Sequence, residues 1–407
     1  MEEVNRFKPV ETNRERSGIM DAKKNALYFV VLLGIVSLFA DMAYEGARSI
    51  TGPFLAILGA SATMVAIIAG FGELIGYGFR IVSGYISDRT RRYWTIALLG
   101  YAINLLAVPL LALAGRWEVA AFLMISERMG KAIRTPSRDT MLSHAGKEIG
   151  RGWGFALHEA MDQVGAMLGP LIVTGVFAYK GSYKLSFLVL GLPAILALAV
   201  LITARIIYPN PQKFEAETIK IETRGFPRAF WIYLAASALV AAAFADFPLI
   251  AYHFKHVKIL EDKWIPLTYA GAMGADALAA LIFGFWYDRK GMRVIIVAVA
   301  VSCLFPVLIF SGKIEYALIG MALWGIGMGA QESIMRAAVA NMTPQDRRAT
   351  GYGVFNTVFG VAWFAGSALM GVLYDHSIHA LIAFSVLAQI VSLPIFYLIR
   401  ESVGKND

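Results

Sequence analysis

A stretch of apolar residues recurs along the whole chain, and it limits what this sequence can fold into more than any other feature. Twelve such segments fall near residues 26–52, 61–86, 94–114, 118–142, 153–178, 184–207, 228–254, 265–287, 293–311, 315–341, 350–372 and 380–400. A helix of about 20 apolar residues spans the hydrocarbon core of a bilayer. No polar segment is long enough to cover so much apolar surface, which argues against a soluble protein. We therefore predict an all-α integral membrane protein with twelve transmembrane helices.

The positive charges predict how the chain lies in the membrane. Lys and Arg gather in the N-terminal segment 1–25, in the linker 209–227 and in alternate connections, and the tail 402–407 is also polar. Basic loops are retained on the cytoplasmic side. Both termini are therefore predicted to be cytoplasmic, in a multi-pass protein of the cytoplasmic (inner) membrane. The formal net charge of +8 reflects this topology, and no nucleic-acid partner is expected.

Short motifs repeat between the two halves of the chain. Phe-Ala-Asp occurs at 39–41 and 244–246, GYISDRTRR (84–92) matches GFWYDRKGMR (284–293), and GRGWGF (150–155) matches TGYGVF (350–355). Each pair occupies the same place in its half, which indicates a duplicated six-span unit. The predicted bundles are 26–208 and 228–401. Such repeats place a substrate site at the interface between the halves.

The loop after the second span carries the most specific motif, formed by Gly84, Asp88, Arg89, Arg91 and Arg92. It resembles the signature of the major facilitator superfamily of secondary transporters, with Thr90 where the family usually has a small residue. The resemblance extends over the whole chain and implies two pseudo-symmetric six-helix bundles that work by alternating access.

The second copy of this loop keeps Gly284, Asp288 and Arg289. In the family these loops act as gating latches, whose ion pairs break when the halves open. The alternative is that these charges only cap helices and set the topology.

A second family element lies in the fifth span, at Gly165, Gly169 and Pro170. It resembles the core of a motif associated with antiporters in this superfamily. Glycines four residues apart also occur wherever two membrane helices pack closely. Antiport and simple packing therefore both remain open.

Ionisable residues inside the predicted spans are the candidate functional residues, because such a group must face a cavity or a partner. The first span carries Asp41, Glu45 and Arg48 on one face. In the fourth span, Glu127, Lys131, Arg134 and Arg138 form a stripe about 60° wide, and the resemblance implies a proton-coupling role for Arg128. Arg134 and Arg138 have the alternative of reaching to the membrane interface.

The remaining candidates belong to five further spans. In the family fold, spans one, four, seven and ten line the cavity, so span seven contributes Asp246 and His253, and span ten contributes Glu332 and Arg336 as a pair four residues apart. Pro248 is expected to weaken the helix beside Asp246. Proton-relay candidates are Glu73, His158, Asp162 and Asp276, of which His158 and Asp162 have helix packing as an equal alternative.

Three functional classes compete for this sequence. A nucleotide-driven pump or membrane enzyme needs a phosphate-binding or nucleophile motif, and the sequence has none. A scaffold leaves the buried charges without a purpose. We therefore predict a monomeric secondary transporter that uses no cofactor and draws on the proton gradient. Proton-coupled antiport, exporting a small and amphipathic solute, is preferred. The alternatives are proton-coupled uptake of an organic anion and transport of a divalent metal bound by Asp41, Asp246 and His253.

Overall fold

The computed structural model describes residues 13–209, 225–343 and 348–400. The first twelve residues of the predicted N-terminal segment, most of the linker 209–227 and all of the tail 402–407 lie outside the described residues.

The first half of the chain forms six long helices. They are α1 (Asn13–Ile57), α2 (Ala62–Thr90), α3 (Tyr93–Leu110, continued by the 3-10 turn η1, Leu111–Leu113), α4 (Trp117–Ile149), α5 (Arg151–Lys180) and α6 (Tyr183–Ile207). Serine side chains begin two of them, since Ser61 accepts a hydrogen bond from the Met64 amide and Ser182 accepts one from the Leu185 amide, both at 3.3 Å. Each cap satisfies an amide that has no partner within the helix.

The second half repeats the pattern with three interrupted spans. Its helices are α7 (Arg228–Ala243), α8 (Phe247–His256), α9 (Ile265–Lys290), α10 (Arg293–Ser302), α11 (Phe305–Ile309), α12 (Ile314–Glu332), α13 (Ile334–Met342), α14 (Arg348–His376) and α15 (Ile378–Ile399). The pairs α7–α8, α10–α11 and α12–α13 each make one span. Counted this way, the described residues contain twelve spans, as predicted, and nine of these are long and apolar enough to be recognised by length and composition alone.

Local chemistry explains each interruption. Pro248 and Pro306 lie in the first turns of α8 and α11, where the missing amide of proline is tolerated. The break near Pro248 therefore agrees with the sequence prediction. At the α12–α13 break, the Ser333 hydroxyl donates to the Gly329 carbonyl at 2.6 Å, a bond of the kind that bends helices.

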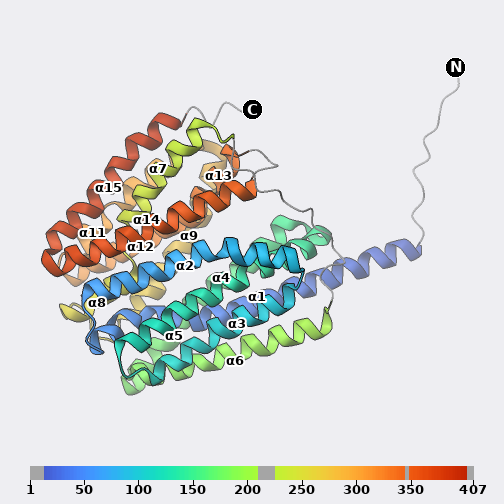
Figure 1. Cartoon of the computed structure of the whole chain (residues 1–407), viewed down its shortest axis with the longest axis horizontal. Helices are drawn as coiled ribbons and strands as arrows, with labels where there is room; N and C mark the ends of the chain where they lie inside the picture. The colour runs from blue at the N-terminus through green and yellow to red at the C-terminus, as the bar shows by residue number, and fades with distance from the viewer. Residues whose placement is uncertain (1–12, 210–224, 344–347, 401–407) are drawn as a thin grey trace.

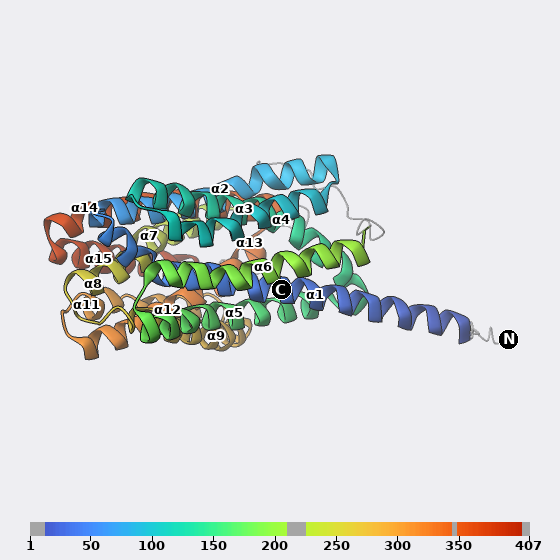
Figure 2. The ribbon, with the colours of Figure 1, turned by 90° about the horizontal axis from the view of Figure 1, so that it is seen from below.

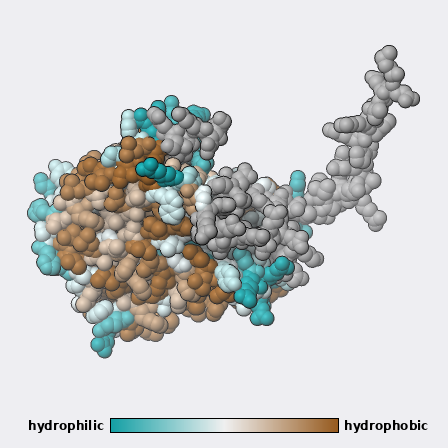
Figure 3. All heavy atoms as spheres, turned by 45° about the horizontal axis from the view of Figure 1, so that its top comes forward, coloured by the Kyte–Doolittle hydropathy of each residue, from teal (hydrophilic) through white to brown (hydrophobic). Residues whose placement is uncertain are grey.

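The helices lie lengthwise in two bundles. Figure 1 shows α1–α6 on one side and α7, α13, α14 and α15 on the other, with the N-terminus extending from one end. Figure 2 shows that the helices run along the long axis in the second view as well. The face in Figure 3 is hydrophobic over most of its area, with hydrophilic side chains gathered at the margins. This distribution suits a protein surrounded by lipid.

The two bundles meet closely at the end that lies away from the N-terminus, here called the closed end. The Asp375 carboxylate at the end of α14 accepts hydrogen bonds from the Thr63 amide at 3.0 Å and the Thr63 hydroxyl at 2.5 Å. Gly52 of α1 lies against the backbone of Pro248, so closely that a Cβ would be 2.8 Å from the Pro248 carbonyl carbon. The other end, from which the N-terminus extends, is called the open end.

Glycines also bring α1 and α5 together. A Cβ on Gly169 would collide with the Met42 carbonyl and lie 2.8 Å from the Gly46 nitrogen, and one on Gly165 would collide with the Leu38 carbonyl. The Gly165, Gly169 and Pro170 segment therefore packs against α1 backbone to backbone. The structure thus shows the helix packing expected of this motif, whereas its link to antiport stays a prediction.

Candidate functional site

A cavity of about 380 Å³ lies between the two bundles. Its acidic lining residues are Asp41, Glu45, Glu73, Asp139, Glu159, Asp162, Asp276 and Glu332, and its basic ones are Arg48, Arg80, Arg128, Lys131, Arg138 and Arg336. Phe155 and Glu159, near the start of α5, are exposed. The cavity therefore reaches toward the open end. Its size is within the range of small-molecule sites.

Arg48 on α1 is the centre of the charge network. Its Nη2 atom lies 3.2 Å from Glu73 Oε1 on α2 and 3.4 Å from Asp246 Oδ1 in the other half, while Nη1 donates to the Tyr44 hydroxyl at 3.3 Å. Arg48 thus joins three helices and both halves of the molecule.

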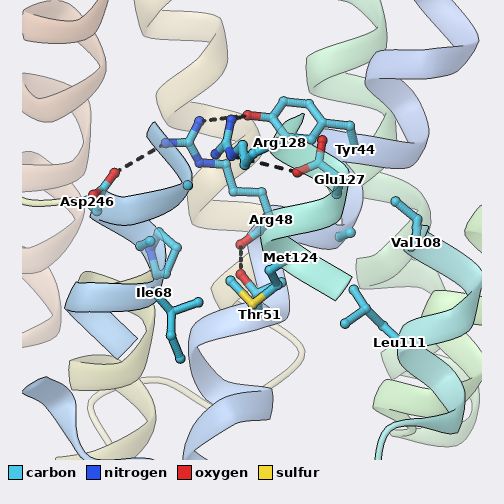
Figure 4. Close-up of a pocket in the computed structure, with 14 residues that line it drawn as sticks. Tyr44, Arg48, Thr51, Ile68, Val108, Leu111, Met124, Glu127, Arg128 and Asp246 are labelled. Atoms are coloured by element: carbon cyan, nitrogen blue, oxygen red, sulfur yellow. Dashed lines mark hydrogen bonds and ion pairs between the residues drawn. The ribbon is translucent and has the colours of Figure 1, made fainter. Parts of the chain in front are cut away.

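Arg128 on α4 binds the same carboxylate. Its Nη2 atom lies 2.8 Å from Glu73 Oε1, its Nε lies 3.7 Å from Glu127 Oε2, and its guanidinium donates to the Tyr44 hydroxyl. Figure 4 shows Asp246, Tyr44 and Glu127 around the two arginines at the upper edge of a second, smaller cavity of about 30 Å³. Two arginines therefore converge on Glu73.

Contacts from the second half fix the central acids. Asp246 Oδ2 accepts hydrogen bonds from the Trp363 indole at 2.9 Å and the Ser367 hydroxyl at 3.0 Å. Glu45 Oε2 accepts one from the Tyr269 hydroxyl of α9 at 2.6 Å. Both acids are buried, so these hydrogen bonds, together with the ion pair between Asp246 and Arg48, offset the large cost of removing a charge from water.

Asp41 and Asp246 have different surroundings, although the repeat predicts equivalent positions. Asp41 lies within the continuous helix α1, and its Oδ1 is 3.7 Å from Arg134 Nη2 in the same half. Asp246 lies at the α7–α8 break and pairs across the halves through Arg48. Asp41 lines the large cavity and Asp246 the small one.

The two outer arginines of α4 make their contacts inside the protein. Arg134 is 0% exposed, and its guanidinium lies 4.3 Å from the centre of the Tyr101 ring. Arg138 lines the large cavity, where its Nη2 is 2.8 Å from Asp139 and its Nη1 donates to Ser37 at 3.4 Å. These contacts inside the protein favour the cavity interpretation of both residues over the interfacial one. Lys131 also lines this cavity, with its Nζ 4.0 Å from the centre of the Tyr44 ring.

His158 and Asp162 are brought together on the cavity wall. His158 Nδ1 lies 3.5 Å from Asp162 Oδ2, and the other ring nitrogen is 2.7 Å from the Ser37 hydroxyl of α1. The three side chains form a continuous polar chain between α1 and α5. A proton relay remains a prediction for them.

Two sequence expectations fail in this structure. His253 does not line either cavity that holds the central charges, because its ring contacts Tyr374, with Nδ1 2.9 Å from the hydroxyl. Among the described residues, no three His, Cys, Asp or Glu side chains are placed to hold a metal ion. The metal-binding set of Asp41, Asp246 and His253 is therefore not assembled.

Glu332 and Arg336 both line the large cavity, but they do not form the predicted pair four residues apart. The break at Ser333 places Glu332 at the end of α12 and Arg336 on α13. In the described residues no ion pair within 4.0 Å joins them. The regular helical spacing assumed from the sequence is interrupted between the two.

The predicted latch loops lie at the open end. Gly84 packs beside Pro136 of α4, Arg89 donates to the Tyr85 hydroxyl at 3.1 Å, and the Arg289 guanidinium is 3.9 Å from the centre of the Phe285 ring. Within the described part of the chain, Asp88 and Asp288 have no ion-pair partner within 4.0 Å. Arg92 precedes α3, and Gly284 lies within α9. Ion pairing between latches therefore stays a prediction for another conformation.

Several residues of the site were missed by sequence reasoning. Ser37, Tyr269, Trp363, Ser367 and the buried Asn104 bind the predicted charges. The Asn104 amide donates to Glu127 Oε1 at 2.5 Å. Tyr269 alone carried a signal, because it lies seven residues, or two helical turns, before Asp276.

Twelve membrane spans in two pseudo-symmetric bundles, around a charged cavity between them, define a membrane transporter. The model of the Major Facilitator Superfamily matches residues 31–261 and 247–406. The chain belongs to this superfamily, whose members are secondary transporters and not enzymes.

Two relatives are similar to this chain over most of its length. An uncharacterised protein of Mycobacterium tuberculosis is 42% identical over 392 residues, covering 95% of this chain and 96% of that protein. An uncharacterised MFS-type transporter of Methanocaldococcus jannaschii is 26% identical over 360 residues, covering 86% of this chain and 89% of that protein.

Two solved structures share the fold at low identity. An inward-facing, occupied bacterial homologue of the human lysosomal transporter Spinster has a TM-score of 0.70 and 13% identity, with 91% of this chain and 96% of that chain covered. The peptide transporter POT in complex with sulfate has a TM-score of 0.72 and 14% identity, with 93% and 95% covered.

Proposed function

We propose that this protein is a proton-coupled symporter for a small organic anion. The observation that carries the proposal is the pairing of Glu73 and Asp246 with Arg48, and of Glu73 with Arg128. The sequence favoured antiport and kept uptake of an organic anion as the alternative. The contacts of the two arginines support the alternative.

A cationic solute meets an obstacle at this site. Four carboxylates at or beside the cavity, those of Asp41, Glu73, Glu127 and Asp246, each already have an arginine partner. A cation must displace a guanidinium to reach them, and it leaves that guanidinium buried without a partner, at a cost of several kcal/mol. An anion takes over an arginine and replaces an existing carboxylate.

Proton binding and anion binding then favour each other. A proton on Glu73 or Asp246 removes the negative charge that holds Arg48, so the arginine is released for the solute. By linkage, an anion on Arg48 raises the proton affinity of the displaced carboxylate to the same degree. Proton and anion therefore bind together, and the empty carrier restores its own ion pairs.

Arg48 also connects solute binding with the contact between the two halves at the closed end. Arg48 holds Asp246, which lies two residues before Pro248, and Pro248 packs on Gly52. Transfer of Arg48 from Asp246 to a solute weakens one link between the halves. We propose that this step permits the closed end to open.

Eight acidic and six basic residues line the large cavity. This charged lining supports a small hydrophilic solute in place of the amphipathic compound expected from the sequence. We further propose that both termini face the cytoplasm, as the basic segments predict, so that the cavity opens inward. The proton gradient across the cytoplasmic membrane supplies the energy, no cofactor is required, and the monomer is the working unit.

Transport into proteoliposomes under an imposed pH gradient tests this function. Uptake of a panel of radiolabelled short organic acids and the accompanying proton movement are measured together. Symport predicts that both move in the same direction, and that Glu73→Gln uncouples them. Glu118→Gln, which removes an exposed acid at the start of α4, is the matched control. Opposite movement of solute and protons would instead support the antiport prediction and contradict this proposal.

A further inference from the structure

Asp276 on α9 differs from the other buried acids of the cavity. It is 2% exposed, lines the large cavity, and its Oδ1 atom has no hydrogen-bond partner among the described residues. The described residues also place no Lys, Arg or His within 4.0 Å of it. An ionised carboxylate in such a position costs several kcal/mol unless a cation or a proton joins it.

Asp276 shares its cavity with other acids. Glu45, Glu159 and Glu332 line the cavity with it and repel a negative charge at this carboxylate. The surroundings therefore favour a positive charge beside this carboxylate and provide none from the protein.

Gly329 of α12 leaves room for the Asp276 carboxylate. A Cβ at Gly329 would lie 2.9 Å from Asp276 Oδ1. The missing side chain thus lets the carboxylate sit in the wall between α9 and α12, beside the cavity.

Positive charge is unevenly divided between the walls of the cavity. The wall formed by α5 and α9 contributes the acids Glu159, Asp162 and Asp276 and no Lys or Arg. The wall formed by α1, α2 and α4 carries four acids, Asp41, Glu45, Glu73 and Asp139, but also five bases, namely Arg48, Arg80, Arg128, Lys131 and Arg138. A solute that carries both charges matches this division better than a simple anion does.

We propose that Asp276 is the subsite for an ammonium group, so that the preferred solute is a zwitterion, an organic acid that also bears an amine. This inference rests on the proposed function, because it places the acid group of the solute on Arg48 and Arg128. A bare metal ion is a poorer occupant, since the acids of the described residues do not converge as ligands.

Helix geometry sets the separation of the two charges. Tyr269 bonds to Glu45, one turn from Arg48, and Asp276 follows Tyr269 by seven residues, or about 10 Å of helix rise toward the open end. The amine and the acid group must therefore be several bonds apart. The longer ω-amino acids are therefore expected to fit better than the shortest ones.

Calorimetric titration of the purified protein with matched ligand pairs tests the inference. The pairs are propionate and β-alanine, butyrate and γ-aminobutyrate, valerate and δ-aminovalerate, and caproate and ε-aminocaproate. A charge-assisted hydrogen bond predicts about ten- to hundredfold tighter binding of the longer amino acids over their partner acids. Asp276→Asn should remove this gain and leave the affinity for the plain acids unchanged, whereas Glu118→Gln should preserve both.

N-acetyl-ε-aminocaproate supplies a test on the wild-type protein that does not depend on the variant folding. It removes the positive charge from the ligand and should bind like caproate. The inference is overturned if the amine brings no gain, if the gain survives in Asp276→Asn, or if that variant instead abolishes the pH dependence of binding by the plain acids, which would make Asp276 a proton site. If neither series binds, the proposed function fails together with the inference. If the plain acids bind but the amine brings no gain, the inference is wrong and the proposed function still stands.

Discussion

Arg48 on α1 and Asp246 at the α7–α8 break form an ion pair between the two halves of the molecule, with 3.4 Å between Arg48 Nη2 and Asp246 Oδ1. Both side chains are largely buried, and Asp246 is held in turn by Trp363 and Ser367. The pair therefore ties the charge state of the cavity to the contact between the bundles.

Asp246→Asn is expected to loosen the closed end. Asparagine can still accept hydrogen bonds from Trp363 and Ser367, but it loses the attraction to Arg48. A membrane-impermeant maleimide added on the side of the closed end should label Thr51→Cys, in a Cys303→Ser background, faster when Asp246→Asn is also present. Asp262→Asn, which disrupts a pair with Lys255 inside the second half, is the control. Equal labelling rates in both variants would contradict this role of Asp246.

Arg48→Lys is expected to weaken solute binding although it keeps the charge. An ammonium cannot contact Glu73, Asp246 and Tyr44 with the fixed fork of a guanidinium. Loss of charge-assisted contacts worth about 1.5–3 kcal/mol predicts a ten- to hundredfold lower affinity for organic acids. Titration calorimetry measures it, with the exposed Arg116→Lys as the control. An unchanged affinity would place the anion site elsewhere.

Arg134→Met is expected to lower the stability of the protein and to have little effect on solute binding, because Arg134 is fully buried and does not line the large cavity. It leaves Asp41 without its partner, at a cost of about 3–5 kcal/mol. The double variant with Asp41→Asn should recover much of this loss. Thermal unfolding in detergent compares the three proteins, and a double variant that is no more stable than Arg134→Met would refute the pairing.

Gly169→Val is expected to separate α1 from α5, because even a Cβ at this position collides with the Met42 carbonyl. The predicted result is loss of folded protein, or of transport where the protein still folds. Gly175→Ala, in the same helix, meets nothing within 4 Å and should be tolerated. Size-exclusion profiles and uptake assays report both effects. Normal behaviour of Gly169→Val would show that the close contact of α1 and α5 is dispensable.

The sequence predicted the fold well because lipid imposes a simple rule. Each span must be apolar over a fixed length, so hydropathy locates it, and the repeated motifs relate the two halves. Even α4, with Glu127, Arg128 and Lys131 among its apolar residues, was placed correctly by its length and its position between loops. Pro248 also marked the break beside Asp246 in advance.

Partners inside the site were less predictable, because they depend on how helices rotate and where they bend. Nothing local in the sequence connects Glu45 with Tyr269 or Asp246 with Trp363, which come from distant spans. Helical spacing paired Glu332 with Arg336, but a single serine bond at Ser333 interrupts the helix between them. The family fold assigned His253 to the cavity together with Asp246, whereas its ring contacts Tyr374.

The pH dependence of organic-acid binding tests the central claim most directly. Titration of the wild-type protein, Glu73→Gln and Asp246→Asn should be carried out over a range of acidic to neutral pH. The proposed linkage predicts that the wild-type protein binds the acid more tightly as pH falls, since protonated carboxylates release Arg48 and Arg128, and that each variant binds with a weaker dependence on pH. Affinity that falls on acidification, or an equal pH dependence in all three proteins, would contradict the coupling of proton and anion at this site.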